Sequence, residues 1–368
     1  MPDAPRLDSR TVLVVDEAGM LDQDTARALF ELADATGAGL DLVGDRHQLP
    51  AVGRGGVLDL AARYAPDRCV ELDGVRRFTD PDYADLSLRM RGGEIPGWVF
   101  DELLDRGEIV VHASEVERDH ALAVRASLGE LVVADTREQV GRINGLAHQI
   151  RLATGEVTAE AADLVTTDAG EQIGVGDRVV TRRNDSEVDV ANRETWTVTA
   201  TTTTITSTAG GLTVVGEPGR RTLPAEYVAQ HVELAYATTA YGAQGASVPT
   251  AHVLVGDHTG AASAYVGMTR GRDHNTAHLV AATVQEARRQ WVDAFSRDRA
   301  DLGPTHAALR AIEDIERYGP NASHDSRRRR RLLSPAEVER RDQERHRQTE
   351  EALDYSRPPR TSSPGIGF

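Results

Sequence analysis

The sequence contains no lysine, because all 42 basic residues of the 368-residue chain are arginines. A phosphate-binding loop of the G-x-x-x-x-G-K-[ST] type needs a lysine beside the nucleotide, so this sequence holds no such loop. The single cysteine, Cys69, excludes an internal disulfide and a cysteine-based zinc site. Aromatic residues make up only 4%, which argues against an extended surface on which nucleic-acid bases stack.

Positive charge is also in short supply. The chain carries 58 acidic residues and a formal net charge of −16, which excludes a protein that attracts nucleic acid over its whole surface. A local basic groove remains compatible with this charge. No stretch approaches the ~20 consecutive apolar residues of a membrane span, and the N-terminus has no apolar signal core. We therefore expect a cytoplasmic protein without a membrane partner.

The order of the expected elements indicates an α/β fold. Apolar runs at 11–15 and 40–43 flank an amphipathic helix over 25–35, and a further strand is expected over 68–72. Alternation of this kind is typical of a parallel sheet covered by helices. Between about 172 and 230, helical periodicity gives way to β-rich segments separated by Gly, Asn and Pro turns, which indicates a small inserted antiparallel barrel.

Two of the expected strands deliver acidic residues at their C-terminal ends. Residues 11–15 lead into Asp16 and Glu17, and residues 40–43 lead into Asp45. This arrangement resembles the centre of a P-loop ATPase, in which the aspartate holds Mg²⁺, usually through water, and the glutamate deprotonates the attacking water. The alternative is a pair of surface acids that caps a turn.

Residues 44–50 form a more specific signal than the acid pair. Gly44 allows the backbone to turn tightly after the strand, and Leu49 with Pro50 stiffens the loop. Between them, the amide of Gln48 is placed to reach a γ-phosphate. The alternative interpretation is a strand-to-helix loop that is polar by chance.

Five segments follow one another in the order of helicase motifs, and they are listed here: Asp16 with Glu17, 44–50, 74–78, 236–245 and 265–272. They resemble motifs II, III, IV, V and VI of superfamily 1 DNA helicases, and in particular the RecD-like helicase region of conjugative relaxases of the TrwC/TraI kind. Residues 176–179 and 184–185 resemble the start of the SH3-like domain that this group inserts before motif V.

The resemblance implies a role for each motif. Asp16 would bind Mg²⁺, Glu17 would be the catalytic base, and Gln48 would sense the γ-phosphate of ATP and link it to DNA. Arg77 of motif IV and Arg270 of motif VI would reach the nucleotide from the second domain, because a planar arginine suits developing phosphoryl charge.

Further assignments follow from the same resemblance. Asp45 and Gly245 would complete the ATP-binding set, and Arg76 is an alternative to Arg77 because the two adjacent arginines leave the register of motif IV open. The expected contacts to single-stranded DNA are His47, Thr239, Tyr241 and Gln244. The arginine run at 327–331 is either a further contact to DNA phosphates or a solvated tail.

The resemblance also divides the chain. We expect a truncated first RecA-like P-loop ATPase domain over 1–70, a second RecA-like domain over 71–171 and 231–285, an inserted small SH3-like β-barrel over 172–230, and a polar, helical or disordered arginine-rich tail over 296–368.

The chain departs from the family at its N-terminal end. Superfamily 1 helicases carry a glutamine motif and a P-loop well before motif II, but here only 15 residues precede Asp16. Relaxases also nick DNA with a histidine cluster and tyrosines, and no such cluster is present. We therefore expect the C-terminal part of an ATP-dependent helicase that needs an upstream polypeptide carrying the P-loop and relaxase domain. The alternative is a catalytically inactive fragment that at most binds single-stranded DNA.

Overall fold

The computed structural model describes residues 6–51, 55–72, 74–93, 95–158, 163–204 and 207–297. The chain divides into two units, Met1–Ala307 and Ala308–Phe368, and every described residue belongs to the first. The expected tail over 296–368, including the arginine run at 327–331, lies outside the described residues except for its first two positions. No helix in the described ranges combines the length and the apolar character needed to span a bilayer.

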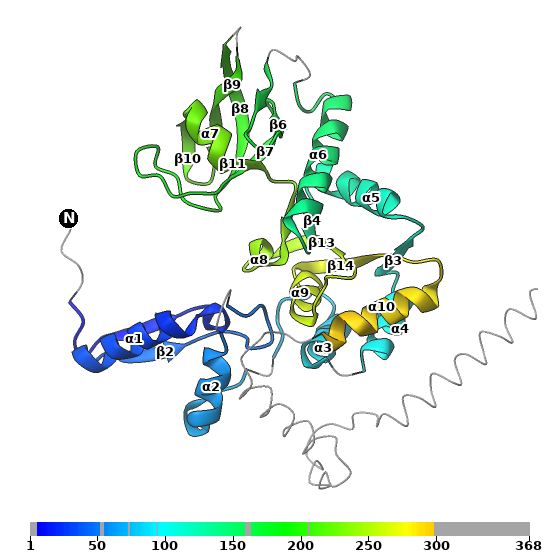
Figure 1. Ribbon diagram of the computed structural model, residues 1–368. Helices are drawn as coiled ribbons and strands as arrows, with labels where there is room; N and C mark the ends of the chain where they lie inside the picture. The colour runs from blue at the N-terminus through cyan, green and yellow to red at the C-terminus, as the bar shows by residue number, and fades with distance from the viewer. Residues whose placement is uncertain are drawn as a thin grey trace, which may run out of the picture. The chain divides into compact units, whose positions relative to one another are not determined.

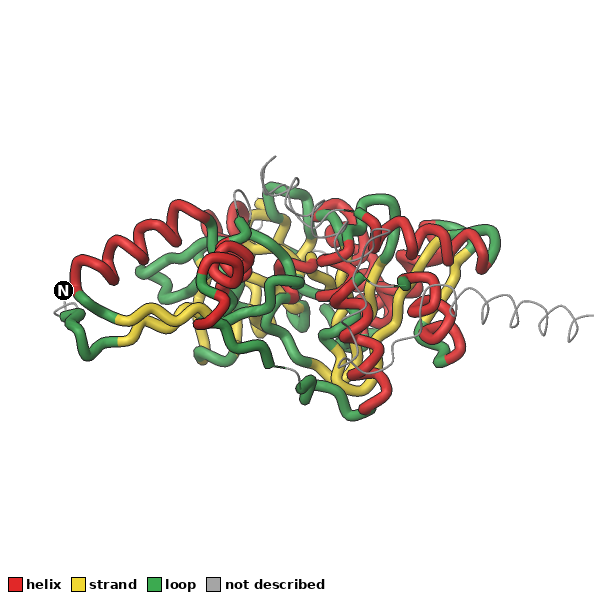
Figure 2. The backbone as a smooth tube through the Cα atoms, turned by 90° about the horizontal axis from the view of Figure 1, so that it is seen from below, coloured by secondary structure: helices red, strands yellow, loops and turns green. Residues whose placement is uncertain are grey.

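The N-terminal part is a two-stranded parallel sheet with one connecting helix. Strands β1 (Val12–Val15) and β2 (Gly39–Leu42) pair in parallel, and α1 (Gln23–Thr36) joins them (Figures 1 and 2). Asp22 begins the helix because its carboxylate accepts a hydrogen bond from the Thr25 backbone N–H at 2.8 Å. Gly37 ends it with a left-handed backbone, φ 74°. The three predicted elements are confirmed to within about two residues at each end.

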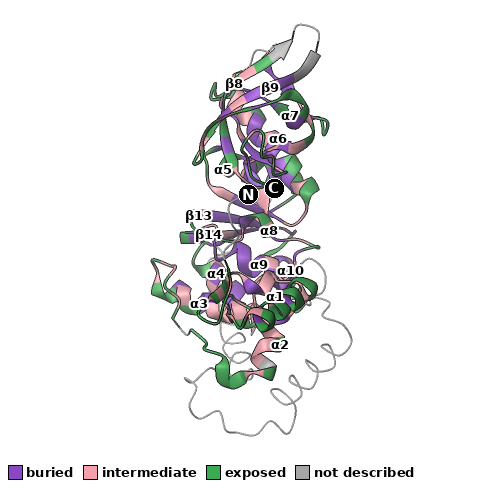
Figure 3. Ribbon diagram, turned by 90° about the vertical axis from the view of Figure 1, so that its left-hand side faces the viewer, coloured by how far each residue is buried: buried purple, intermediate pink, exposed green. Residues whose placement is uncertain are grey.

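This small sheet leaves apolar side chains in contact with solvent. Val12 and Val14, on one face of β1, are 56% and 64% exposed, and Phe30 of α1 is 48% exposed. Figure 3 likewise shows much of α1 as exposed. Within the described residues, β1 pairs with β2 alone, so each strand has one edge without a neighbour.

The predicted strand over 68–72 is wrong. The chain instead forms helix α2 (Val57–Tyr64) and a short 3₁₀ turn, η2 (Pro66–Arg68), followed by extended backbone without strand pairing. Val70 and Leu72 are 87% and 82% exposed. The alternating apolar residues fit a strand by pattern, but a strand also requires a neighbouring strand to which its backbone can hydrogen-bond.

The larger α/β part is built on a five-stranded parallel sheet, confirming the expected mixed α/β class. Its order is β12-β4-β13-β14-β3, and every pairing is parallel. The strands are β3 (Ile109–His112), β4 (Leu131–Ala134), β12 (Ala237–Thr239), β13 (Val248–Leu254) and β14 (Gly271–Val280).

Helices cover both faces of this sheet (Figure 1). One core contains Val253 of β13 together with residues of α3 (Pro81–Gly92), α4 (Pro96–Asp105), α9 (Ala261–Gly267) and α10 (Val284–Ser296). The other contains the adjacent Leu254 together with residues of α5 (Glu115–Ser127) and α6 (Arg137–Ala153). Neighbouring side chains of one strand thus enter opposite cores, as the pleat of a strand requires.

An antiparallel sheet interrupts the α/β part between α6 and β12. Its order is β10-β9-β8-β7-β11, and its strands are β7 (Arg178–Thr181), β8 (Thr195–Thr204), β9 (Ser207–Gly216), β10 (Gly219–Leu223) and β11 (Val232–Leu234). A short pair, β5 (Val165–Thr166) with β6 (Gln172–Ile173), and helix α7 (Ala225–His231) accompany it. Strand β11 extends this sheet beyond residue 230, where we expected the α/β part to return. An SH3-like architecture for the insertion stays a prediction.

Candidate nucleotide and single-stranded DNA site

The backbone brings the two predicted acidic loops together at one edge of the small sheet. β1 and β2 end side by side, and the Ala18 N–H donates to the carbonyl of Val43 at 2.8 Å. Glu17 has a left-handed backbone, φ 51°, and its N–H donates to the Asp16 carboxylate at 2.8 Å. A Cβ on Gly44 would lie 2.9 Å from the Ala18 nitrogen. Glycine at 44 therefore allows the close contact between the two loops.

Asp45 connects its loop to the larger α/β part. Its carboxylate accepts hydrogen bonds from the His47 backbone N–H at 2.9 Å, from Arg91 Nε of α3 at 3.3 Å, and from the Tyr265 hydroxyl of α9 at 3.3 Å. In the same loop, the Gln48 N–H donates to the Asp45 carbonyl, and the buried Gln48 Oε1 has no hydrogen-bond partner within the described ranges. An unpartnered buried amide oxygen is costly, which makes it a candidate for a ligand contact.

The segment that follows β12 also reaches the acids. It passes through helix α8 (Ala240–Ala243), and the Gln244 side-chain amide then donates to Glu17 Oε2 at 3.2 Å. The Gln244 Oε1 is buried and accepts no hydrogen bond from any residue that the structure describes. Gly245 has φ 81°, a conformation that glycine adopts at little cost. The structure thus places Gln244 of motif V, a segment expected to contact both DNA and the nucleotide, beside Glu17.

Two arginines lie together on the other side of this cluster. Arg270 is fully buried, and its guanidinium donates to the Val266 carbonyl at 2.9 Å and to Thr269 Oγ1 at 3.3 Å. Arg77 donates to the Thr269 carbonyl at 2.7 Å. Of the two alternatives for motif IV, the structure brings Arg77 to Arg270 and leaves Arg76 exposed.

The electrostatics of Arg270 favour an anion. Burial, followed by the charge of Arg77, lowers the pKa of Arg270 to about 10, while Glu17 and Asp45 act in the opposite direction. Its hydrogen bonds within the described ranges go to neutral oxygens, and no carboxylate there lies within ion-pair distance. A buried cation with neutral partners beside a second cation is unfavourable unless a negative group neutralises it. A nucleotide phosphate has the charge and the acceptor oxygens that this pair lacks.

Asp16 and Glu17 could supply only a few of the ligands that a metal ion needs. Asp16 is exposed and Glu17 is half-buried, and no group of three or more metal-ligating side chains occurs in the ranges that the structure describes. A Mg²⁺ ion held by Asp16 would therefore take most of its oxygen ligands from water and phosphate. Mg²⁺ is commonly bound in this way at phosphoryl-transfer sites.

Two of the predicted DNA contacts border a separate cleft of about 1100 Å³. Thr239 accepts a hydrogen bond from the Gly242 N–H at 3.2 Å and so begins α8, while the Tyr241 hydroxyl donates to the Pro50 carbonyl at 3.0 Å. Both residues line the cleft, whereas His47 and Gln244 lie outside its lining. None of the predicted nucleotide residues lines it.

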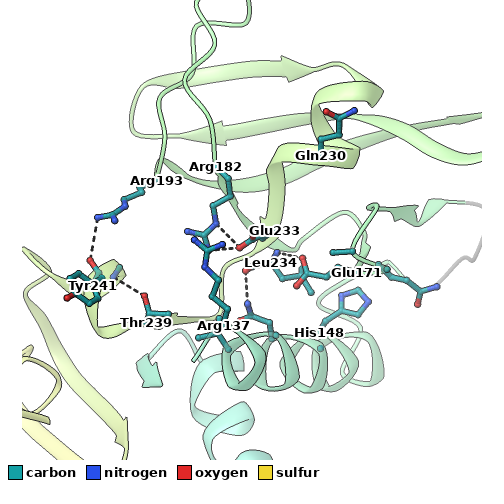
Figure 4. A pocket seen from close by; sticks show the side chains of 18 of the residues that line it. Arg137, His148, Glu171, Arg182, Arg193, Gln230, Glu233, Leu234, Thr239 and Tyr241 are labelled. Carbon is teal, nitrogen blue, oxygen red and sulfur yellow. Dashed lines mark hydrogen bonds and ion pairs between the residues drawn. The ribbon is translucent and has the colours of Figure 1, made fainter. Parts of the chain in front are cut away.

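The cleft lies between α6, the antiparallel sheet and the β12–α8 segment (Figure 4), and its charged lining was not predicted. Arg182 forms an ion pair with Glu233, while Arg193 donates to the Tyr241 carbonyl at 3.4 Å. Glu171 accepts from the Leu234 N–H at 3.0 Å, and burial raises the pKa of Glu171 to about 7. Arg137 contributes a further cation. The sequence gives no local signal for this set, because its members come from segments that only the fold brings together.

The architecture agrees with solved structures of one class of protein. Pif1 helicase from Candida albicans superposes with a TM-score of 0.50 at 15% identity, covering 83% of this chain and 76% of that one. Pif1 from Bacteroides, in complex with ADP-AlF3 and ssDNA, gives a TM-score of 0.50 at 19% identity, covering 84% and 76%. The fold is thus that of RecA-like helicase domains.

Sequence relatives define the family. Residues 3–114 match the AAA domain family. The multifunctional conjugation protein TraI of Escherichia coli is 34% identical over 168 residues, 44% of this chain and 9% of TraI. The probable conjugal transfer protein TraA of Sinorhizobium fredii is 28% identical over 279 residues, 73% of this chain and 24% of TraA. Together with the fold, these matches support a superfamily 1 helicase region of conjugative relaxases, and the chain spans about a quarter or less of the lengths of TraI and TraA.

Proposed function

We propose that this chain supplies the magnesium and γ-phosphate side of an ATP-dependent motor that moves along single-stranded DNA. The observation that carries the proposal is the convergence of Glu17, Gln244, Arg77 and the fully buried Arg270 from four distant parts of the sequence. Helicase relatives that act in conjugation, and a Bacteroides Pif1 of the same fold whose structure contains ADP-AlF3 and ssDNA, support this assignment.

The chain's own residues would divide the work in the following way. Glu17, held by the Gln244 amide, is placed to take a proton from the attacking water, and Asp16 is the acid available to Mg²⁺. Arg77 and Arg270 would stabilise the negative charge that develops on the transferred phosphoryl group. Because Gln244 lies shortly after Thr239 in the chain, a movement of Gln244 at the nucleotide would also displace the proposed DNA contact at Thr239.

A P-loop from another polypeptide segment would complete the site. The chain has no lysine, and the β1–β2 sheet exposes Val12 and Val14. A further parallel strand with its helix would pair with a free edge of this sheet and cover those valines. We propose that this strand and helix belong to the P-loop segment of a longer relaxase–helicase.

An inactive fragment that binds single-stranded DNA is the second candidate. The observation in its favour is that the cleft containing Thr239, Arg137 and Arg193 is separate from the nucleotide residues, so DNA binding does not require a complete ATP site. Under this alternative, binding would weaken with salt, because it depends on arginine contacts to phosphates, and would not change on addition of ATP.

ATP hydrolysis in the presence of single-stranded DNA distinguishes the two candidates. We expect the chain alone to show no turnover above background and the same chain preceded by a P-loop segment to be active. Glu17→Gln in the longer protein should lower kcat by about 10² to 10⁴, the usual contribution of a general base. Glu31→Gln, an exposed change on α1, is the matched control and should leave kcat unchanged. Equal turnover by the chain alone would overturn the need for a P-loop.

A further inference from the structure

Helix α6 presents two glycines to the cleft. Gly141 and Gly145 lie one turn apart in the interior of this helix, and both line the cleft. A Cβ added at either position would meet nothing within 4 Å, so packing within the described residues does not require glycine there. Glycine destabilises a helix interior relative to alanine. No close packing in the described part of the chain therefore explains why the helix carries glycine at these two positions. The two glycines leave an open strip on the face of α6 that lines the cleft.

One turn further along the same face, His148 provides an independent sign of a ligand. Its side chain is buried, with a relative exposure of 4%, and its ring lies next to Glu171 in the cleft (Figure 4). Nδ1 contacts both Asp177 carboxylate oxygens at 2.9 and 3.0 Å. The buried Asp177 also accepts hydrogen bonds from the Tyr236 hydroxyl and from the Gly174 N–H. In the part of the chain that the structure describes, the buried His148 Nε2 has no hydrogen-bond partner.

Asp177 fixes the hydrogen-bonding character of that free nitrogen. The carboxylate accepts a hydrogen bond from Nδ1–H, and in the ring tautomer that carries its one proton on Nδ1, Nε2 is an acceptor. A buried acceptor without a donor is costly to keep in a folded protein. A ligand that brings an N–H group to Nε2 would satisfy it.

The two ends of the cleft differ in the charge of their side chains. The ionisable side chains around His148 include Asp177, which contacts its ring, and Glu171. Glu233 is paired with Arg182, so this end of the cleft is unfavourable for phosphate. At the other end of α6, Arg137 lies with Thr239 and Arg193 on the cleft lining. Arg137 and His148 are eleven residues apart on the helix, which corresponds to roughly 16 Å. A ligand that contacts both residues must therefore be longer than a single functional group.

We infer that the strip along α6 is a base-binding groove for single-stranded DNA, in which a nucleobase lies against Gly141 and Gly145 and donates an N–H to His148 Nε2. The sugar-phosphate backbone then continues toward Arg137 and Arg193. The inference rests on the proposed binding of single-stranded DNA and adds that the bases, as well as the phosphates, are recognised.

The glycines allow a test in which folding and binding change in opposite directions. Gly141→Ala and Gly145→Ala should each raise the midpoint of urea unfolding, because alanine favours the helix. Each should also weaken binding of an oligothymidylate by about tenfold, the effect of losing one base contact. Glu138→Ala, on the exposed part of the same helix, is the control and should leave affinity unchanged. Alanine variants that are more stable and bind equally well would overturn the inference.

An abasic oligonucleotide of equal length separates bases from phosphates. The wild-type chain should bind oligothymidylate more tightly than the abasic strand, and His148→Leu should remove this preference without changing affinity for the abasic strand. His120→Leu, at an exposed histidine, is the matched control. Equal binding of both strands by the wild type would overturn the base-binding groove. Failure of the wild type to bind either strand would instead overturn the proposed binding of single-stranded DNA.

Discussion

At the scale of single residues, Arg270 is a fully buried arginine that forms no ion pair with an acidic side chain among the described residues. Arg270 donates to two neutral oxygens and lies near a second cation, Arg77. Burial of a charge costs several kcal/mol unless hydrogen bonds and an opposite charge compensate. A contribution to stability is thus a poor explanation for a buried arginine at this position, and an anion-binding role explains it better.

Replacement of Arg270 should lower the rate of catalysis without lowering the stability of the fold. Arg270→Met keeps most of the side-chain volume and removes the buried charge, so the chain should unfold in urea at an equal or higher concentration than the wild type. In the P-loop-completed protein, the same change should lower kcat for ATP hydrolysis by about 10³ or more, as for other arginines that contact a transferred phosphoryl group. A stable variant with unchanged kcat would contradict the assignment.

Three histidines form a hydrogen-bonded row across the parallel sheet, outside both proposed sites. His112 Nε2 lies 3.0 Å from His278 Nδ1, His278 Nε2 lies 3.0 Å from His252 Nδ1, and His252 Nε2 lies 2.8 Å from Glu130. Burial, then the neighbouring histidines, lowers the pKa of His278 to about 3, and burial also lowers the pKa of His112 and His252.

This row predicts a loss of stability in acid. A histidine whose pKa is lower in the folded state binds a proton mainly when unfolded, so its stabilising contribution is present above about pH 6.5 and is lost as the pH falls toward 3. Each proton taken up on unfolding contributes about 1.4 kcal/mol per pH unit. Urea unfolding of the chain between pH 7.5 and 4.5 measures the slope. His278→Phe should make it shallower than in the wild type, whereas His120→Phe should not.

Individual side chains were predictable from sequence only where a motif specified them. The order of segments pointed to Asp16, Glu17 and Arg270, and the structure brings Glu17 and Arg270 into one cluster. No sequence pattern could have singled out His148, because its importance depends on a buried carboxylate 29 residues away and on an open cleft.

At the scale of elements, the sequence predicts the helices and strands that have clear local signals and misses those whose signals are weak. The expected helix over 25–35 corresponds to α1, which begins after the cap at Asp22 and ends at Gly37. The helices α4 and α5 and the strand β3 were not predicted. β3 has only four residues, and the buried apolar face of α5 consists of Leu122 and two alanines, which produce little hydrophobic contrast.

The start of α6 offers a test of local stability beneath the cleft. Thr136 Oγ1 accepts from the Gln139 N–H at 3.2 Å, and the Gln139 side chain accepts from the Thr136 N–H at 3.1 Å. This capping box predicts that Thr136→Ala lowers the free energy of unfolding by about 1 kcal/mol, while Thr136→Ser largely preserves it. Urea unfolding of both variants is the measurement. Equal losses in both would show that the hydroxyl does not cap the helix.

At the scale of the whole molecule, the net charge argues against general nucleic-acid binding, whereas the fold creates a local cluster of arginines. The net charge of −16 excludes general attraction to nucleic acid, whereas the fold gathers Arg137, Arg182 and Arg193 around one cleft. The absence of lysine excludes a P-loop of the G-x-x-x-x-G-K-[ST] type within this chain, whereas its relatives include conjugation proteins of much greater length. We propose that the described part of the chain holds the phosphate-facing arginines and the general base, and that a phosphate-binding loop from another segment completes the site.

The central claim is that Arg77, Arg270 and Gln48 face the γ-phosphate position of a nucleotide held by a completed site. The most direct measurement is a crystal structure of the P-loop-completed chain with ADP, Mg²⁺ and aluminium fluoride. We expect the fluoride group to lie within hydrogen-bonding distance of both guanidinium groups and of the Gln48 amide, with Glu17 beside the attacking water. A nucleotide bound elsewhere, with Arg270 still bonded only to Val266 and Thr269, would contradict it.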